Sequence, residues 1–240
     1  MMKKWWGLIA VALVVAIGMA VIPLFKSTED STGYGLPLSG KMVILDPGHG
    51  GIDGGASSKT GLLEKDISLE ISLHLRDYLQ EAGALVIMTR EEDKDLAASD
   101  TKKVRSRKVE DLKERVRLIN HSDADMFVSL HLNAIGESKW SGAQTFYNRA
   151  IEGNEQLAKH VQGELVRNLE NTTRLAKPIQ NVYLIQQATI PGALIEVGFL
   201  SNPAEAEALD TTDYQQKVAA SIYNGILRYT NNEPLPDEQG

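Results

Sequence analysis

Short apolar runs alternate with longer amphipathic segments from residue 41 onward. The short runs predict strands at residues 42–45, 84–89, 126–132, 143–147, 182–185 and 193–197. Apolar residues that recur every three or four positions predict helices at residues 64–82, 109–120, 155–170 and 214–226. Strands that alternate with helices indicate an α/β fold, in which a largely parallel or mixed sheet packs between helices.

The amino terminus has a different pattern. Lys3 and Lys4 precede residues 5–25, a run of 21 residues without a charge. A positive start before an apolar run of this length predicts a signal peptide or membrane anchor at residues 1–25, with or without cleavage. It also predicts translocation of the rest of the chain. The polar residues 26–40 are expected to form a linker, 41–230 a single domain and 231–240 a polar tail.

The amino-acid composition limits which partners and which metal ligands are possible. With 42% hydrophobic residues among 240, the chain can bury one full core. Its net charge of −7 argues against a general nucleic-acid binder. There is no cysteine, so any metal site must use His, Asp or Glu.

One local exception to the acidic charge is residues 102–117, with eight Lys or Arg against three acids. A solvated helix face is the favoured interpretation of this stretch, and contact with an anionic polymer is the alternative. The polar residues 90–106 are too many for an ordinary connection and form a candidate flap over a site.

A glycine-rich loop that carries His49 follows the first predicted strand. Five glycines between residues 48 and 55 allow the backbone to approach a ligand closely, at an entropic cost that stability alone does not explain. The alternatives are a phosphate-binding loop and a simple tight turn. The loop matches neither glycine motif for nucleotide binding, so we regard the first alternative as the weaker one.

Four candidate site residues lie near the ends of predicted elements. His49 follows a strand, Glu64 begins a helix, His131 lies near a strand end and Glu196 lies within the last strand. Ligands of α/β sheets bind beyond the carboxyl ends of strands, so we expect these side chains to converge. Two imidazoles and one carboxylate suit a catalytic zinc site, which keeps its fourth position open.

Glu196 is an ionisable residue in an otherwise apolar strand, so we expect it to have either an ion-pair partner or a functional role. A catalytic base is one interpretation, and a salt bridge to Lys or Arg is the other. Asp46 is a candidate to orient a metal-bound histidine. His74, His121 and His160 are weak ligand candidates, with His160 expected on a solvent-exposed helix face.

Together these motifs resemble the zinc-dependent N-acetylmuramoyl-L-alanine amidases, which cleave muramic acid from the stem peptide of peptidoglycan. The matching motifs are LDPGHGG from residue 45, LEKD from 63, SLHLNA from 129 and EVGFLSN from 196. The resemblance covers about residues 41–229. It implies that His49, Glu64 and His131 bind one Zn²⁺ and that Glu196 is the catalytic acid or base. It also implies a twisted, roughly six-stranded sheet between helices.

Further segments resemble amidases of spore-forming bacteria that act in the spore cortex: LPLSGK from residue 36, WSGAQ from 140, NLENTTR from 168 and GILRY from 225. This resemblance implies a role in making muramic δ-lactam and hence in germination, on peptidoglycan outside the cytoplasmic membrane. Residues 171–181 depart from the usual family pattern, so substrate contacts cannot be transferred to them. No wall-binding repeat is evident, so targeting would come from the anchor, the basic stretch or an unidentified accessory protein.

Two other functions remain open from the sequence. A zinc carboxypeptidase acting on the stem peptide would need a cation for the terminal carboxylate, and no residue is singled out for that role. A non-catalytic wall-binding or regulatory domain would not need Glu196. In the favoured mechanism zinc lowers the pKa of its water toward about 7, and Glu196 passes the proton to the leaving amine.

Overall fold

The computed structural model of the protein describes residues 35–235. The predicted signal or anchor at 1–25, most of the predicted linker and the end of the tail lie outside these residues. Between residues 35 and 235, no helix is both long enough and apolar enough to cross a membrane. Leu38, from the stretch assigned to the linker, is fully buried, and its N–H donates to the Ala82 carbonyl at 2.8 Å.

Six strands form one mixed sheet, in the order β2-β1-β3-β6-β4-β5. Their bounds are β1 Met42–Pro47, β2 Leu85–Met88, β3 Met126–Asn133, β4 Gln144–Tyr147, β5 Lys177–Pro178 and β6 Gly192–Phe199. Strands β2, β1, β3 and β6 are parallel, β4 runs antiparallel to β6, and β5 is parallel to β4. The predicted α/β fold with a mixed sheet is confirmed.

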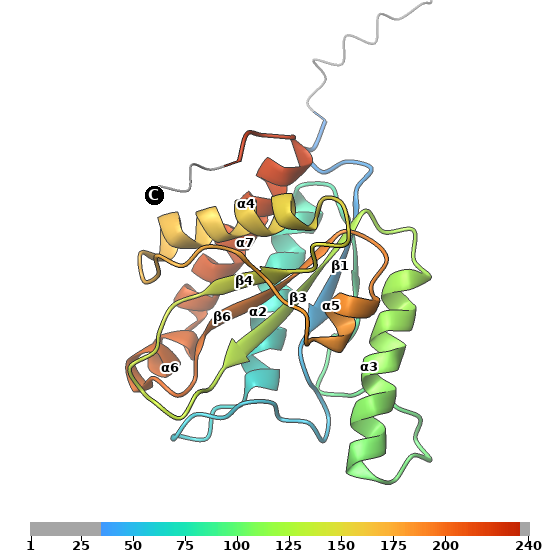
Figure 1. Ribbon diagram of the computed structural model, residues 1–240, viewed down its shortest axis with the longest axis vertical. Helices are drawn as coiled ribbons and strands as arrows, with labels where there is room; N and C mark the ends of the chain where they lie inside the picture. Colours follow the sequence, from blue (N-terminus) through green and yellow to red (C-terminus); the bar gives the residue numbers. More distant parts are fainter. Residues whose placement is uncertain (1–34, 236–240) are drawn as a thin grey trace, which may run out of the picture. The chain divides into compact units, whose positions relative to one another are not determined.

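Helices cover both faces of this sheet (Figure 1). Their bounds are α2 Glu64–Glu81, α3 Val104–Asn120, α4 Asn154–Leu169, α5 Tyr183–Gln187, α6 Pro203–Leu209 and α7 Thr212–Thr230. The larger core cluster joins one face to α2, α4 and α7, and the smaller one joins the other face to α3 and α5. On α2, Ile67, Ile71, Leu75 and Leu79 recur every fourth residue and are at most 3% exposed, as the pattern predicts.

One predicted strand is wrong, and some elements were not anticipated from the apolar pattern. Residues 182–185 were expected as a strand, but most of them belong to the short helix α5, because a short buried apolar run fits either element. The strand β5 and the helix α6 have no apolar pattern that predicts them. The polar stretch 90–106 ends inside α3, and its Asp93 binds the glycine-rich loop by accepting the Gly51 N–H at 2.8 Å.

Parallel pairing places the carboxyl ends of β1, β3 and β6 side by side. Asp46 of β1 is the register partner of Ser129 in β3, and His131 of β3 is the partner of Glu196 in β6. The glycine-rich loop leaves β1 at the same edge, because Pro47 is its last residue. This edge therefore holds the candidate residues that follow the strands.

Candidate metal centre

Three of the four candidate residues meet at this edge. Glu64, the first residue of α2, lies between two histidines: its Oε1 is 2.9 Å from His131 Nδ1 and 3.1 Å from His49 Nε2. The potential ligand atoms of the three residues all lie within 4.8 Å of one another. Glu64 is buried, whereas both histidines are partly exposed. The cluster therefore remains accessible from the side of the histidines.

This donor set fits a zinc ion. Two atoms about 2.0–2.1 Å from one tetrahedral ion are roughly 3.4 Å apart, close to the observed separations. Burial lowers the pKa of His49, but Glu64 and Asp53 outweigh it and raise that pKa above its ordinary value. Burial raises the pKa of Glu64, but hydrogen bonds with His131 and His49 outweigh it and hold that pKa far below its ordinary value. The cluster thus stabilises a positive charge, which a metal cation would supply in place of a proton.

Close packing against the site explains two of the loop glycines. A Cβ atom on Gly48 would lie 2.4 Å from His131 Cε1, and one on Gly55 would lie 2.5 Å from Glu64 Oε2. Cβ atoms essentially never make contacts this short. The sequence indicated close approach of the loop to a ligand, and the structure shows close approach to the side chains that would hold one.

Two buried arginines hold the loop backbone. His49 has φ of 61°, a left-handed conformation that costs a non-glycine residue about 1 kcal/mol or more. The Arg115 guanidinium donates to the carbonyls of His49 and, at 2.7 Å, Pro47. The Arg90 guanidinium donates to the Gly48 carbonyl at 2.8 Å. Both arginines are 1% exposed, so these charge-assisted hydrogen bonds are shielded from water.

Asp46 does not orient a histidine, contrary to the prediction. Its carboxylate accepts hydrogen bonds from Ser129 Oγ at 2.6 Å, Arg115 Nη1 at 2.7 Å and Thr89 Oγ1 at 2.8 Å. The Asp46 side chain shares its face of β1 with Ile44, and helix α3, which supplies Arg115, covers that face. Asp46 therefore pairs with Arg115 of α3 and supports the loop from beneath.

Asp53 occupies the position that the sequence analysis assigned to Asp46. Its Oδ2 is 3.0 Å from His49 Nδ1, which directs Nε2 of the same ring toward Glu64. Its Oδ1 accepts a hydrogen bond from Lys108 Nζ at 2.7 Å. The sequence analysis missed this residue. The sequence feature that could have identified Asp53 is that it is the only carboxylate in the loop and lies four residues after His49.

We expect Asp46→Asn to lower the free energy of unfolding by about 2–3 kcal/mol at pH 7, because it weakens a buried charged hydrogen bond. Arg115 keeps its ion pair with Asp111 in this variant, so its charge is not left without a partner. Burial raises the pKa of Asp46, but Arg115, Ser129 and Thr89 outweigh it and hold that pKa below its ordinary value. The stabilisation is therefore present above the unfolded pKa of about 3.9 and is lost as pH falls through the folded-state pKa. Urea unfolding at pH 7 and below pH 4 measures it. An equal difference at both pH values would contradict the prediction.

Glu196 lies beside the cluster. Among residues 35–235 it forms no ion pair with Lys or Arg, and its buried Oε2 atom has no hydrogen-bond partner. The salt-bridge interpretation is therefore wrong for the described part of the chain. Burial, aided by the charge of Glu64, raises the pKa of Glu196 to about 7, although His131 and His49 act in the opposite direction. A carboxyl group with this pKa can both accept and donate a proton near neutral pH.

The other histidines lie outside this cluster. His121 follows α3 as its C-cap, as predicted, with Nδ1 2.9 Å from the Arg117 carbonyl, and His74 is partly buried on α2. His160 was expected in solvent, yet it is 3% exposed. Helix α4 packs against both the sheet and α7, so it has a broader buried surface than a single apolar stripe suggests.

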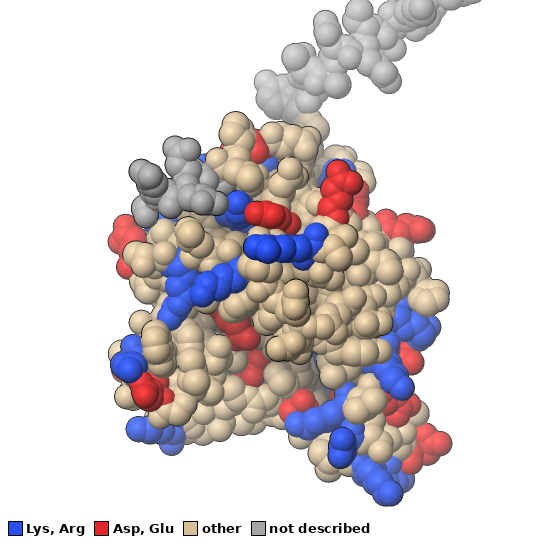
Figure 2. Space-filling view, in the orientation of Figure 1, with Lys and Arg blue, Asp and Glu red and all other residues tan. Residues whose placement is uncertain are grey.

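The basic stretch is only partly a solvated helix face. Lys and Arg side chains gather over α3 at the lower right of Figure 2. Arg107 pairs with Asp95 at 2.5 Å, and Lys108 pairs with Asp53. Arg115 is buried in the network that supports the loop. The stretch therefore contributes to the candidate site as well as to the surface.

Comparisons with known proteins identify the family of the chain. Residues 43–228 match the family model described as N-acetylmuramoyl-L-alanine amidase. The germination-specific N-acetylmuramoyl-L-alanine amidase of Bacillus subtilis is 59% identical over 214 residues, which cover 89% of this chain and 90% of that protein.

Solved structures are also similar. The CwlD amidase from Clostridioides difficile, determined in complex with the GerS lipoprotein, has a TM-score of 0.78 and 45% identity, covering 80% of this chain and 100% of that one. An N-acetylmuramoyl-L-alanine amidase from Clostridium difficile 630 has a TM-score of 0.71 and 32% identity, covering 81% and 98%. The chain belongs to the N-acetylmuramoyl-L-alanine amidase family and is an amide hydrolase of that class.

Proposed function

We propose that this amidase is a zinc enzyme, in which His49, Glu64 and His131 hold one Zn²⁺ per chain and Glu196 is the catalytic acid and base. The observation that carries the proposal is the convergence of three suitable donors beside Glu196, whose buried Oε2 atom has no hydrogen-bond partner among the described residues. When bound, zinc supplies a Lewis acid that polarises the scissile carbonyl and generates a nucleophile from water near neutral pH.

The chain's own residues position the donors and move the proton. Backbone N–H groups fix both oxygens of Glu64: Leu132 donates to Oε1 at 3.0 Å and Ala56 to Oε2 at 2.7 Å. Glu196 accepts the proton that the attacking water loses. It then donates that proton to the nitrogen of L-alanine as the bond to muramic acid breaks, which returns the carboxylate to its starting state.

The proposed substrate is peptidoglycan in the spore cortex, where removal of the stem peptide would precede δ-lactam formation and hence germination. The 59% identity with a germination-specific amidase supports this role. We place the catalytic domain at residues 41–230, outside the cytoplasmic membrane, exported by residues 1–25. Cell fractionation tests the location, and a full-length chain found soluble in the cytoplasm would contradict it. Because the Clostridioides difficile amidase was solved with a lipoprotein, a lipoprotein partner is a further candidate, testable by co-purification.

Peptide release from purified peptidoglycan, followed by mass spectrometry, tests the proposed reaction. We expect intact stem peptides that begin with L-alanine, together with unsubstituted muramic acid. A chelator should abolish release, and added zinc should restore it. A carboxypeptidase would release only carboxyl-terminal amino acids, and a wall-binding domain would release nothing.

Asp53→Asn is expected to weaken zinc binding by about 10–100-fold, because an amide holds the His49 ring less firmly than a carboxylate does. Competition with a zinc-binding dye measures the affinity. Asp77→Asn is a matched control, since Asp77 is an exposed carboxylate on α2 that pairs with Arg76. Equal zinc affinity of the Asp53 variant and the wild type would show that Asp53 does not orient the histidine.

A further inference from the structure

A row of side chains crosses the sheet from the metal centre to the β5 edge. His131, Glu196 and Gln144 are register partners on β3, β6 and β4, and partners in register point to the same face. Gln144 Nε2 extends the row by donating to the Leu175 carbonyl at 3.0 Å, two residues before β5. Since neighbouring strands lie about 4.8 Å apart, Leu175 is roughly 10 Å from Glu196 along this row.

The row forms an open strip. Next to this row, toward the amino ends of β3 and β6, helix α5 covers the same face. Its apolar side chains pack there with Phe127, Leu194 and Phe146. His131, Glu196 and Gln144 are partly exposed, and Leu175 is 54% exposed. An extended ligand could therefore lie across the strands beside α5 without displacing a core residue.

Beyond the far end of the strip lies a positive charge without an ion pair in the described part of the chain, on Lys177. Lys177 of β5 is the register partner of Phe146, so it points to the same face as Glu196, and it is exposed. Among the described residues Lys177 forms no ion pair or side-chain hydrogen bond. In Figure 2, Lys and Arg side chains border a hollow in the left half of this face, and acidic side chains are visible within it.

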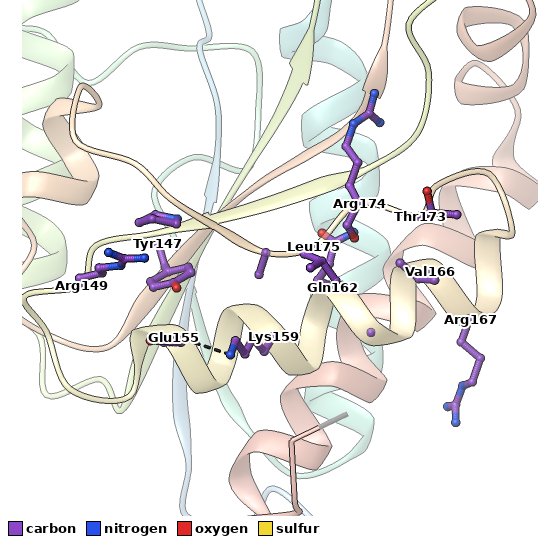
Figure 3. A pocket seen from close by; sticks show the side chains of 13 residues that line it. Tyr147, Arg149, Glu155, Lys159, Gln162, Val166, Arg167, Thr173, Arg174 and Leu175 are labelled. Carbon is purple, nitrogen blue, oxygen red and sulfur yellow. Dashed lines mark hydrogen bonds and ion pairs between the residues drawn. The ribbon is translucent and has the colours of Figure 1, made fainter. Parts of the chain in front are cut away.

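A cavity of about 590 Å³ between β5 and α4 is the alternative site for binding an anion (Figure 3). Its Lys159 pairs with Glu155 at 3.1 Å, and its Arg167 pairs with Glu164. Figure 3 shows that the Arg167 and Arg174 side chains point in opposite directions, away from the cavity. Arg149 and Arg174 also line this cavity and form no ion pair among the described residues, so the cavity keeps positive charge. It lies between β5 and α4, however, whereas Lys177 lies on the sheet face of the metal centre.

We propose that this strip, formed by Gln144, Leu175 and Lys177, binds the stem peptide and that Lys177 pairs with one of its carboxylates. This inference rests on the function proposed above, which places the L-alanine nitrogen at Glu196. The peptide carries free carboxylates, whereas the glycan beside it is uncharged, so a cation distinguishes the two. Lys177 of β5 lies two residues beyond Leu175, so its Cα is roughly 12 Å from that of Glu196. An extended chain advances about 3.3–3.6 Å per residue, so this distance brings about the third residue of the peptide to Lys177.

Two soluble substrates test this strip: N-acetylmuramoyl tripeptide with free carboxylates and the same compound with its carboxylates amidated. For Lys177→Gln we expect KM for the acidic substrate to rise about 3–10-fold, the loss of one charged hydrogen bond at a partly exposed site. Its kcat, and its KM for the amidated substrate, should match those of the wild type. Lys177→Arg should keep the wild-type KM. Lys217→Gln, an exposed lysine on α7, is the matched control.

The outcomes separate the two proposals. If the wild type cleaves both substrates and Lys177→Gln has an unchanged KM, or equal changes with both, the peptide strip is wrong while the amidase function stands. If the wild type cleaves neither substrate, the proposed function fails and this inference fails with it. Circular dichroism and zinc content establish that each variant is folded and loaded before the kinetics are compared.

Discussion

Glu196→Gln is expected to keep zinc and to lose peptide release by about 10²–10⁴-fold, the usual contribution of general acid–base catalysis. This loss corresponds to about 3–5 kcal/mol in the activation barrier. Glutamine preserves the size of the side chain but cannot accept a proton from water. Because Glu196 lies beside the donor cluster and is not one of its three members, its replacement should leave metal binding intact.

Zinc content, melting temperature and muropeptide cleavage should be measured on one preparation of this variant. Glu164→Gln is a matched control, because Glu164 is a buried glutamate outside the site that pairs with Arg167 and Arg228 on the α4–α7 side. The control should lower the melting temperature and leave the folded fraction active. A folded, zinc-loaded Glu196→Gln variant with near wild-type cleavage would falsify the catalytic assignment.

His131→Ala is expected to lose both zinc and peptide release. Removing this imidazole leaves only two of the three protein donors that a catalytic zinc site uses. The fall in zinc affinity should exceed the about 10–100-fold typical of losing an outer hydrogen-bond partner, which is the result expected for Asp53→Asn. Metal analysis and dye competition measure both variants side by side.

His74→Ala is the control for this substitution, since His74 lies on α2 outside the cluster. It should bind one zinc per chain and remain active. Retention of zinc by folded His131→Ala, together with its loss from His74→Ala, would mean that the wrong histidine has been assigned. Chelation of the wild type should reproduce the loss of activity reversibly, which separates metal loss from misfolding.

Hydrophobic periodicity was sufficient to predict the α/β class and five of the six predicted strands. The prediction succeeds for β1, where the apolar residues 43–45 are all buried, because a strand covered on both faces has a nearly continuous apolar run. It fails at residues 182–185, because four residues are too few to distinguish a period of two from one of 3.6. It also fails at β5, whose two exposed residues owe their strand conformation to pairing with β4 alone.

By itself the sequence determined which residue types stand where strands end and helices begin. Parallel topology then makes convergence of His49, Glu64 and His131 predictable, because the carboxyl ends of neighbouring strands share one edge. Only the tertiary structure decided the partners of the buried charges. Asp46 meets Arg115 because helix α3 covers the face to which the Asp46 side chain points, and Asp53 reaches His49 through the fold of the loop. The Asp46–Arg115 pairing depends on the position of a helix distant in sequence, and the Asp53–His49 pairing depends on the backbone path of the loop. The pattern of apolar and polar residues records neither.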